Sequence, residues 1–122
     1  MSTLIFQARS REDAVVLTPH GEVDAETQQV FEATVRTAVM ARPVVVDLSR
    51  LRYFALSALD ALTRTQLVAE AREHRLLYVD PPPPVRMMLT LSGVDQRIEV
   101  LPATEGARPD PAPEVEAPTA VC

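Results

Sequence analysis

The sequence predicts an α/β domain in which about three helices pack on a small mixed sheet of about five strands. Short segments rich in β-branched residues alternate with longer segments whose apolar residues recur at helical spacing. The order is two strands, then helix, strand, helix, strand, helix and strand, which favours right-handed crossovers between partly parallel strands. At 122 residues, a single domain is the default expectation.

The chain is expected to begin with a β-hairpin. Residues 3–8 and 14–18 are short and apolar, and the charged residues 9–13 separate them. The sequence PHGEVD at residues 19–24 then breaks the strand pattern, and Gly21 is expected to form a turn there.

The next two elements are an amphipathic helix and a central strand. Asp24 suits the N-cap of a helix over residues 25–40, because a carboxylate accepts hydrogen bonds from the first helical amides. Pro43 lies beyond the end of that helix. The apolar run VVVDL at residues 44–48 is typical of a strand buried on both faces, so we expect it near the middle of the sheet.

A second helix is expected to begin at Ser57 and to run to about His74. Ser57 and Asp60 have the spacing of a capping box, a serine followed three residues later by an acid. Residues 75–80 (RLLYVD) form the next strand. One stripe of the helix is expected to face the core, and it contains Ala58, Leu62, Thr65 and Ala69.

The C-terminal part of the domain follows four consecutive prolines. Pro84 suits the first turn of a third helix, and Gly93 suits its left-handed cap. Residues 97–101 form the last strand, which completes a domain over residues 1–102. Residues 103–122 are rich in proline, alanine and acids, and this composition predicts a disordered tail.

Composition excludes several classes of function. The net charge of −5 argues against nucleic-acid binding, which depends on basic patches. All basic side chains other than the two histidines are arginines, so the chain has no lysine nucleophile or lysine base. The one cysteine, Cys122, cannot form an internal disulfide, and no apolar stretch is long enough for membrane insertion. These features predict a cytoplasmic protein.

No catalytic or metal-binding motif is found in the sequence. His20 and His74 have no cysteine or acid nearby at metal-ligand spacing, so no metal site is expected. The sequence also lacks a glycine-rich phosphate loop and a nucleophile elbow. We therefore expect a protein that is not an enzyme and holds no cofactor.

Three segments carry a resemblance to a known family: GEVD at 21–24, PVVVDLSRLRYF at 43–54 and VRMMLTLSGVDQRIEV at 85–100. Together they resemble the STAS domain family, the fold of bacterial anti-sigma factor antagonists. Each motif is short, but their order and spacing match the family from about Leu4 to Leu101. The resemblance implies a regulatory protein-binding module.

The chain departs from the family at the loop that follows the central strand. In the family this loop reads aspartate-serine-x-glycine, and an anti-sigma kinase phosphorylates its first serine. The aligned residues here are Ala55, Leu56, Ser57 and Ala58. Leu56 cannot accept a phosphate. Ser57 is one position further along, which rotates a helical side chain by about 100°, so capping is favoured over phosphorylation for Ser57.

A partner-binding surface is expected around this loop. Leu56 and Leu67 lie on the side of the second helix opposite the core stripe, with Asp60 and Thr63 between them. Isolated surface leucines are common in proteins, so a patch without function is the alternative. The predicted partner-binding residues are Asp24, Phe54, Ala55, Leu56, Ser57, Ala58, Asp60, Thr63 and Leu67. For Asp24, N-capping alone is the favoured interpretation.

The resemblance implies that the partner is an anti-sigma factor of the ATPase-kinase type, whose capture releases a sigma factor and so controls transcription. Without the acceptor serine, the chain would be a constitutive antagonist, a scaffold or a decoy. Two alternatives stay open: an accessory subunit of an ABC lipid-transport ATPase, and a small-molecule-sensing STAS domain. Homodimer formation is also left open by the sequence.

Overall fold

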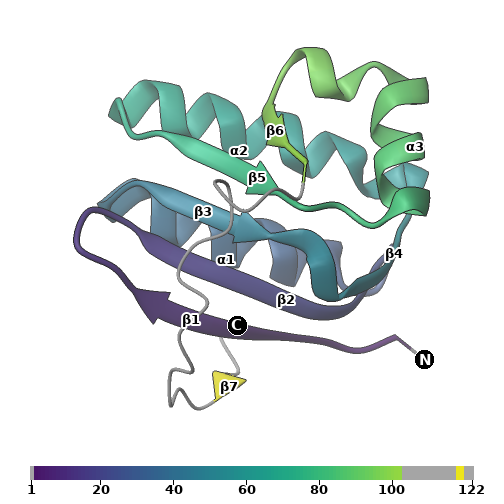
Figure 1. Cartoon of the computed structure of the whole chain (residues 1–122), viewed down its shortest axis with the longest axis horizontal. Coiled ribbons are helices and arrows are strands. Elements are labelled where there is room, and N and C mark those ends of the chain that lie inside the picture. The colour runs from purple at the N-terminus through teal and green to yellow at the C-terminus, as the bar shows by residue number, and fades with distance from the viewer. Residues whose placement is uncertain (1, 103–117, 120–122) are drawn as a thin grey trace.

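The computed structural model describes residues 2–102 and 118–119, and Figure 1 shows their arrangement. The strands are β1 (Leu4–Ser10), β2 (Val15–Val23), β3 (Val44–Asp47), β4 (Leu51–Phe54), β5 (Leu76–Val79), β6 (Glu99–Leu101) and β7 (Pro118–Thr119). The α-helices are α1 (Gln28–Ala41), α2 (Leu59–Arg72) and α3 (Pro83–Ser92). Short 3₁₀ turns are η1 (Leu48–Arg50), η2 (Leu56–Ala58) and η3 (Val94–Gln96).

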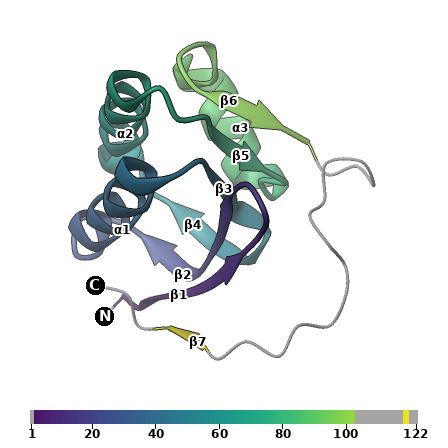
Figure 2. The same ribbon diagram turned by 90° about the vertical axis from the view of Figure 1, so that its left-hand side faces the viewer.

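The strands form one mixed sheet, as the sequence predicts. Its order is β6-β5-β3-β2-β1-β7, and β4 pairs with β2 beyond the end of β3. β1 is antiparallel to β2, whereas β2, β3, β4, β5 and β6 are parallel to the strands they contact in this group. Helices α1 and α2 lie side by side on one face of the sheet (Figure 2). Helix α3 lies at the end toward which β3 and β5 point (Figure 1).

An aromatic cluster and the predicted helix stripe fill the core between the sheet and α1 and α2. The ring of Phe31 lies 6.1 Å from that of Phe6 and 5.3 Å from that of Phe54, with an edge-on contact to Phe54. The predicted core-facing stripe of the second helix is confirmed, because its four members are all buried: Ala58, Leu62, Thr65 and Ala69.

The turn predicted over residues 19–24 is wrong, because β2 continues as a strand to Val23. Pro19 is compatible with the strand because of its position. β2 pairs with β3 through Leu17 and with β4 from Gly21 onwards, so Pro19 lies in the gap between these two partners. A proline has no N–H to donate to a neighbouring strand, and none is needed at this point.

Gly21 is required by a close approach of two strands and not by a turn. A side chain at this position would place its first carbon 2.2 Å from the carbonyl oxygen of Thr3. The backbone of Gly21 also has a φ of +123°, which other residues rarely adopt. The extra strand β4 was also missed, because its pattern of two exposed residues between two buried ones is too short to recognise.

The predicted helix boundaries are partly correct. α1 begins at Gln28, three residues later than expected, and α2 begins at Leu59, two residues later than expected. The left-handed cap at Gly93 is confirmed by a φ of 81°. The predicted disordered tail lies outside the described residues, except that Pro118 and Thr119 form β7.

Candidate functional site

The candidate site lies where the parallel strands β2 and β4 end. The loop after β4 is fixed to β2 by a hydrogen bond of 2.8 Å from the Ala55 amide to the Val23 carbonyl. The side chains of Phe54, Ala55 and Ala58 are buried. These three predicted contact residues therefore support the loop from inside the core, and their side chains are not available to a partner.

Leu56 and Ser57 are the two residues of this loop that point into solvent. The side chain of Leu56 is 68% exposed, a high value for a leucine. Burial of its neighbours explains the apolar sequence of the loop, because Phe54 and Ala58 anchor the turn that carries Leu56 outward.

The capping box predicted at Ser57 is wrong. The residue that precedes α2 is Ala58, and the helix start has no side-chain cap. The Ala58 amide instead donates to the Ala55 carbonyl at 2.9 Å, and the Leu59 amide donates to the Leu56 carbonyl. Because the turn η2 satisfies these donors with main-chain oxygens, the hydroxyl of Ser57 is not needed as a cap.

Asp24 stabilises the turn before α1, although it is not the N-cap, a position that Thr27 occupies. Its carboxylate accepts hydrogen bonds from the amides of Glu26 (2.9 Å) and Thr27 (3.3 Å), and from the hydroxyl of Ser2. The hydrogen bond from Ser2, followed by those from Glu26 and Thr27, holds the pKa of the Asp24 carboxyl below its ordinary value. Asp24 is therefore a structural anchor beside the loop.

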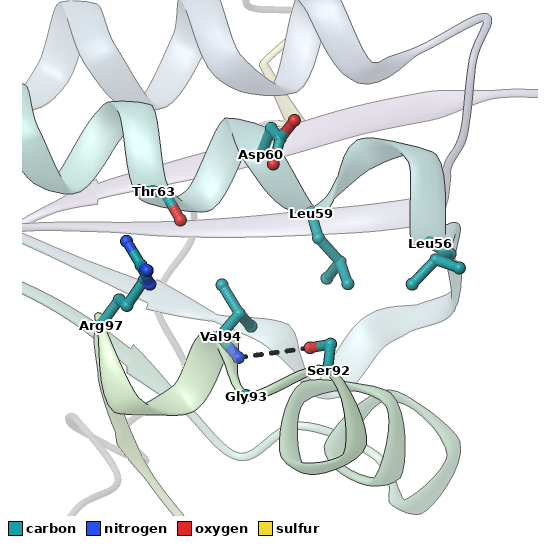
Figure 3. A pocket seen from close by; sticks show the side chains of 8 residues that line it. All are labelled: Leu56, Leu59, Asp60, Thr63, Ser92, Gly93, Val94 and Arg97. Carbon is teal, nitrogen blue, oxygen red and sulfur yellow. Dashed lines mark hydrogen bonds between the residues drawn. The ribbon is translucent and has the colours of Figure 1, made fainter.

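A groove of about 460 Å³ opens between α2 and the end of α3 (Figure 3). We name it the α2–α3 groove. One wall comes from η2 and α2, and the other from the end of α3 and the segment after it. The lining residues are Leu56, Leu59, Asp60, Thr63, Ser92, Gly93, Val94 and Arg97.

The groove has an apolar end and a polar end. Figure 3 shows Leu56 at one end, the side chains of Leu59 and Val94 in the middle, and Thr63 and Arg97 at the other end. The wall at Val94 is held by a hydrogen bond of 3.3 Å from its amide to the Ser92 hydroxyl. Within residues 2–102 and 118–119, no carboxylate forms an ion pair with Arg97.

The predicted residues of α2 follow one stripe along the helix. Asp60, Thr63 and Leu67 are spaced by three and four residues, which places them on the same face of α2. Leu56 precedes them in the turn η2. Leu67 is 59% exposed, as expected, and Asp60 is exposed as well. Of these four, Leu56, Asp60 and Thr63 line the groove, whereas Leu67 lies beyond it.

Sequence analysis missed the second wall of the groove. Ser92, Val94 and Arg97 come more than thirty residues after Leu56, and only the packing of α3 places them opposite it. Gly93 was expected only as a helix cap. A charged residue soon after that cap was the one feature that could have drawn attention to Arg97.

Neither histidine belongs to a metal cluster in the described residues, and each lies within hydrogen-bond distance of an oxygen of the fold. In the part of the chain that the structure describes, no group of three histidine, cysteine or acidic side chains could hold a metal ion. His20 lies 2.7 Å from the amide oxygen of Gln7, and His74 donates from Nδ1 to the carbonyl of Val39 at 2.6 Å. No helix in the described residues is long and apolar enough to span a bilayer.

Comparison with known proteins assigns the family. The family model described as "Mlab, STAS domain" matches residues 6–102. The chain therefore belongs to the STAS domain family. No curated protein sequence matches the chain.

Solved structures show the same fold at low sequence identity. An anti-sigma factor antagonist from Mycobacterium paratuberculosis is 21% identical, with a TM-score of 0.75 over 86% of this chain and 91% of that one. The antagonist SpoIIAA in its unphosphorylated form is 24% identical, with a TM-score of 0.65 over 83% and 90%. Part of the murine anion transporter Slc26a9 is also similar, at 15% identity and a TM-score of 0.64 over 88% of this chain and 22% of that one.

Proposed function

We propose that this chain is a regulatory protein-binding module that captures an anti-sigma factor of the ATPase-kinase type and thereby releases a sigma factor. Contact is made by the α2–α3 groove, which Leu56, Asp60 and Thr63 help to line, and by the exposed Leu67 beyond it. The STAS fold and the similarity to anti-sigma factor antagonists support the class of partner.

The observation that carries the proposal is the exposure of Leu56. Leu56 is 68% exposed at the apolar end of the groove (Figure 3). The sequence resemblance aligns it with the family's phosphoacceptor serine. Burying most of a leucine side chain in an interface contributes about 1.5–3 kcal/mol. A leucine here strengthens an apolar contact and removes the phosphate switch.

The experiment is a binding titration of the purified full chain against purified anti-sigma factors of the ATPase-kinase type from the source organism. Wild type is expected to bind at least one of them. Leu56→Glu is expected to weaken that complex by about 30-fold or more, because a carboxylate replaces a buried apolar group.

The matched control is Met40→Glu. Met40 is also an exposed apolar residue, but it lies at the end of α1, and that helix runs back from the site toward the opposite end of the sheet. The affinity of Met40→Glu for the anti-sigma factor is expected to equal that of wild type. Equal binding by wild type and Leu56→Glu would place the contact on another surface, and no binding by any anti-sigma factor would reject the proposed partner.

An accessory subunit of an ABC ATPase is the second candidate. A leucine at position 56 cannot accept a phosphate, which favours a partner whose binding is not controlled by phosphorylation. An ABC ATPase would be such a partner. The same two variants separate the candidates when the purified ATPase replaces the anti-sigma factor in the titration.

A further inference from the structure

The outer edge of β1 carries a pairing that the proposed function does not use. One edge of β1 pairs with β2 along its whole length, from Leu4 to Ser10. On the other edge, the described partner is β7, with Phe6 opposite Thr119 and Gln7 opposite Pro118. Two residues near the C-terminus thus lie against a strand that begins the domain (Figure 2).

The hydrogen-bonding direction of each residue in β1 follows from one contact. The amide of Glu22 donates to the carbonyl of Thr3 at 3.0 Å, so the main-chain hydrogen-bonding groups of Thr3 point toward β2. Successive residues of a strand face opposite edges. Phe6 therefore presents its N–H and C=O outward, as do the residues two positions before and after it, Leu4 and Ala8. An uncovered row of such groups is a template for pairing with another chain.

The sequence of β7 fits this edge. Thr119 lies opposite Phe6, whose main-chain N–H and C=O point toward the outer edge, so the two residues can exchange main-chain hydrogen bonds. Pro118 lies opposite Gln7, which faces β2, so the missing N–H of the proline falls where no hydrogen bond is formed. A shift by one residue would place Pro118 opposite an outward-facing residue and remove a donor.

The length of the chain allows this pairing within one molecule. From β6 to β7 the sheet crosses five strand spacings, a distance of roughly 24 Å. The 15 residues from 103 to 117 join Pro102 to β7, and a chain of this length reaches at most roughly 50 Å. A tethered segment has an effective concentration of the order of millimolar, which favours it over a second molecule at lower concentration.

We propose that the outer edge of β1 is a strand-binding site and that Pro118–Thr119 of the same chain occupy it. This pairing covers the edge around Phe6 and denies it to a second copy of the protein. The inference is independent of the anti-sigma partner, because β1 contributes no residue to the α2–α3 groove.

The test is amide hydrogen exchange, measured by NMR on the full chain and divided by the intrinsic rate of each amide. Wild type is compared with Thr119→Pro, which removes the N–H aimed at Phe6, and with Thr119→Val, which keeps it. In wild type and Thr119→Val, the Phe6 amide is expected to exchange about tenfold more slowly than those of Leu4 and Ala8. In Thr119→Pro, this difference is expected to disappear.

Three results would overturn the proposal. Equal exchange at Phe6, Leu4 and Ala8 in wild type would show that the edge is open. Slow exchange at Phe6 that persists in Thr119→Pro would show that another group covers it. Protection that increases with protein concentration would assign the edge to a second copy.

Discussion

Glu32 on α1 and Arg64 on α2 form a bidentate ion pair between the two helices that cover one face of the sheet. The Nε and Nη2 atoms of Arg64 each lie 2.8 Å from one carboxylate oxygen of Glu32. The pair joins the first half of α2 to α1, and Arg64 directly follows Thr63, which lines the groove.

This pair predicts a dependence of stability on pH. The hydrogen bonds from Arg64 hold the pKa of Glu32 below its ordinary value of 4.5. A lowered pKa in the folded state stabilises the protein above pH 4.5, and this contribution is lost as the pH falls through the folded-state pKa. Glu32→Gln is expected to lower the free energy of unfolding at pH 7 by about 0.5–1 kcal/mol.

Urea unfolding at pH 7 and at pH 3 measures this effect. The difference in the free energy of unfolding between wild type and Glu32→Gln should be smaller at pH 3 and in 1 M salt. Glu70→Gln is a suitable control, because Glu70 is an exposed acid of α2 whose one described side-chain contact is with Gln66. A gap of the same size at both pH values would contradict the prediction.

A second prediction concerns the buried hydroxyl pair of Thr65 and Tyr78, whose oxygens are 3.1 Å apart. Both residues are fully buried, and burial raises the pKa of Tyr78 above its ordinary value of 10.0. Thr65→Val leaves the Tyr78 hydroxyl without its described partner and is expected to cost about 1–3 kcal/mol. Tyr78→Phe is expected to cost less, because Thr65 still bonds to the carbonyl of Ala61.

A double-mutant cycle by thermal or urea unfolding measures the coupling. The double variant should cost less than the sum of the two single variants, by about 0.5–1.5 kcal/mol. Strict additivity would show that the two hydroxyls do not interact. The raised pKa also predicts that stability is lost as the pH rises above 10, more steeply in wild type than in Tyr78→Phe.

The two described glycines should respond differently to alanine. At Gly21, the new methyl group would meet the carbonyl of Thr3 at 2.2 Å, so Gly21→Ala is expected to destabilise by roughly 3 kcal/mol or more. At Gly93, no atom lies within 4 Å of the new group, and only the left-handed backbone opposes it, at a cost of about 1 kcal/mol. The melting temperatures of wild type and both variants measure this difference. Equal decreases in melting temperature for Gly21→Ala and Gly93→Ala would contradict the prediction.

The last prediction tests the proposal that Leu56 stands where the family has its phosphoacceptor serine. Leu56→Ser introduces a hydroxyl at this position, and the exposure of the residue leaves it accessible to a kinase. With an anti-sigma kinase that binds the chain, and with ATP, this variant is expected to gain phosphate while wild type stays unmodified. Intact-mass measurement detects the addition of one phosphate.

Ser57→Ala is the control for that experiment. If wild type is phosphorylated and Ser57→Ala is not, then Ser57 has taken over as acceptor, and the proposal of a phosphate-insensitive binder is wrong. If Leu56→Ser stays unmodified although the complex forms, the loop is not presented to the kinase as in the family.

Local patterns determined much of the fold. The alternation of apolar segments placed all three helices and five of the strands, because periodicity reports which side of an element is buried. The core stripe from Ala58 to Ala69 and the left-handed cap at Gly93 followed from the same reasoning. The exposure of Leu56 and Leu67 was also predictable, since both lie opposite that stripe.

Other features depended on neighbours distant in sequence. Pro19 and Gly21 predicted a turn, yet they belong to the strand β2. The strand continues because β2 changes partners at Pro19 and because Thr3 approaches Gly21 closely. Ser57 read as a helix cap, yet main-chain carbonyls satisfied the amides there.

The sequence by itself determined the fold family and the approximate positions of the three helices, because these depend on residue types and their local spacing. Only the tertiary structure decided that Phe54, Ala55 and Ala58 are buried and that Val94 and Arg97 complete a groove with Leu56. The physical reason is that a groove forms where two helices pack, and packing joins residues that no local pattern connects.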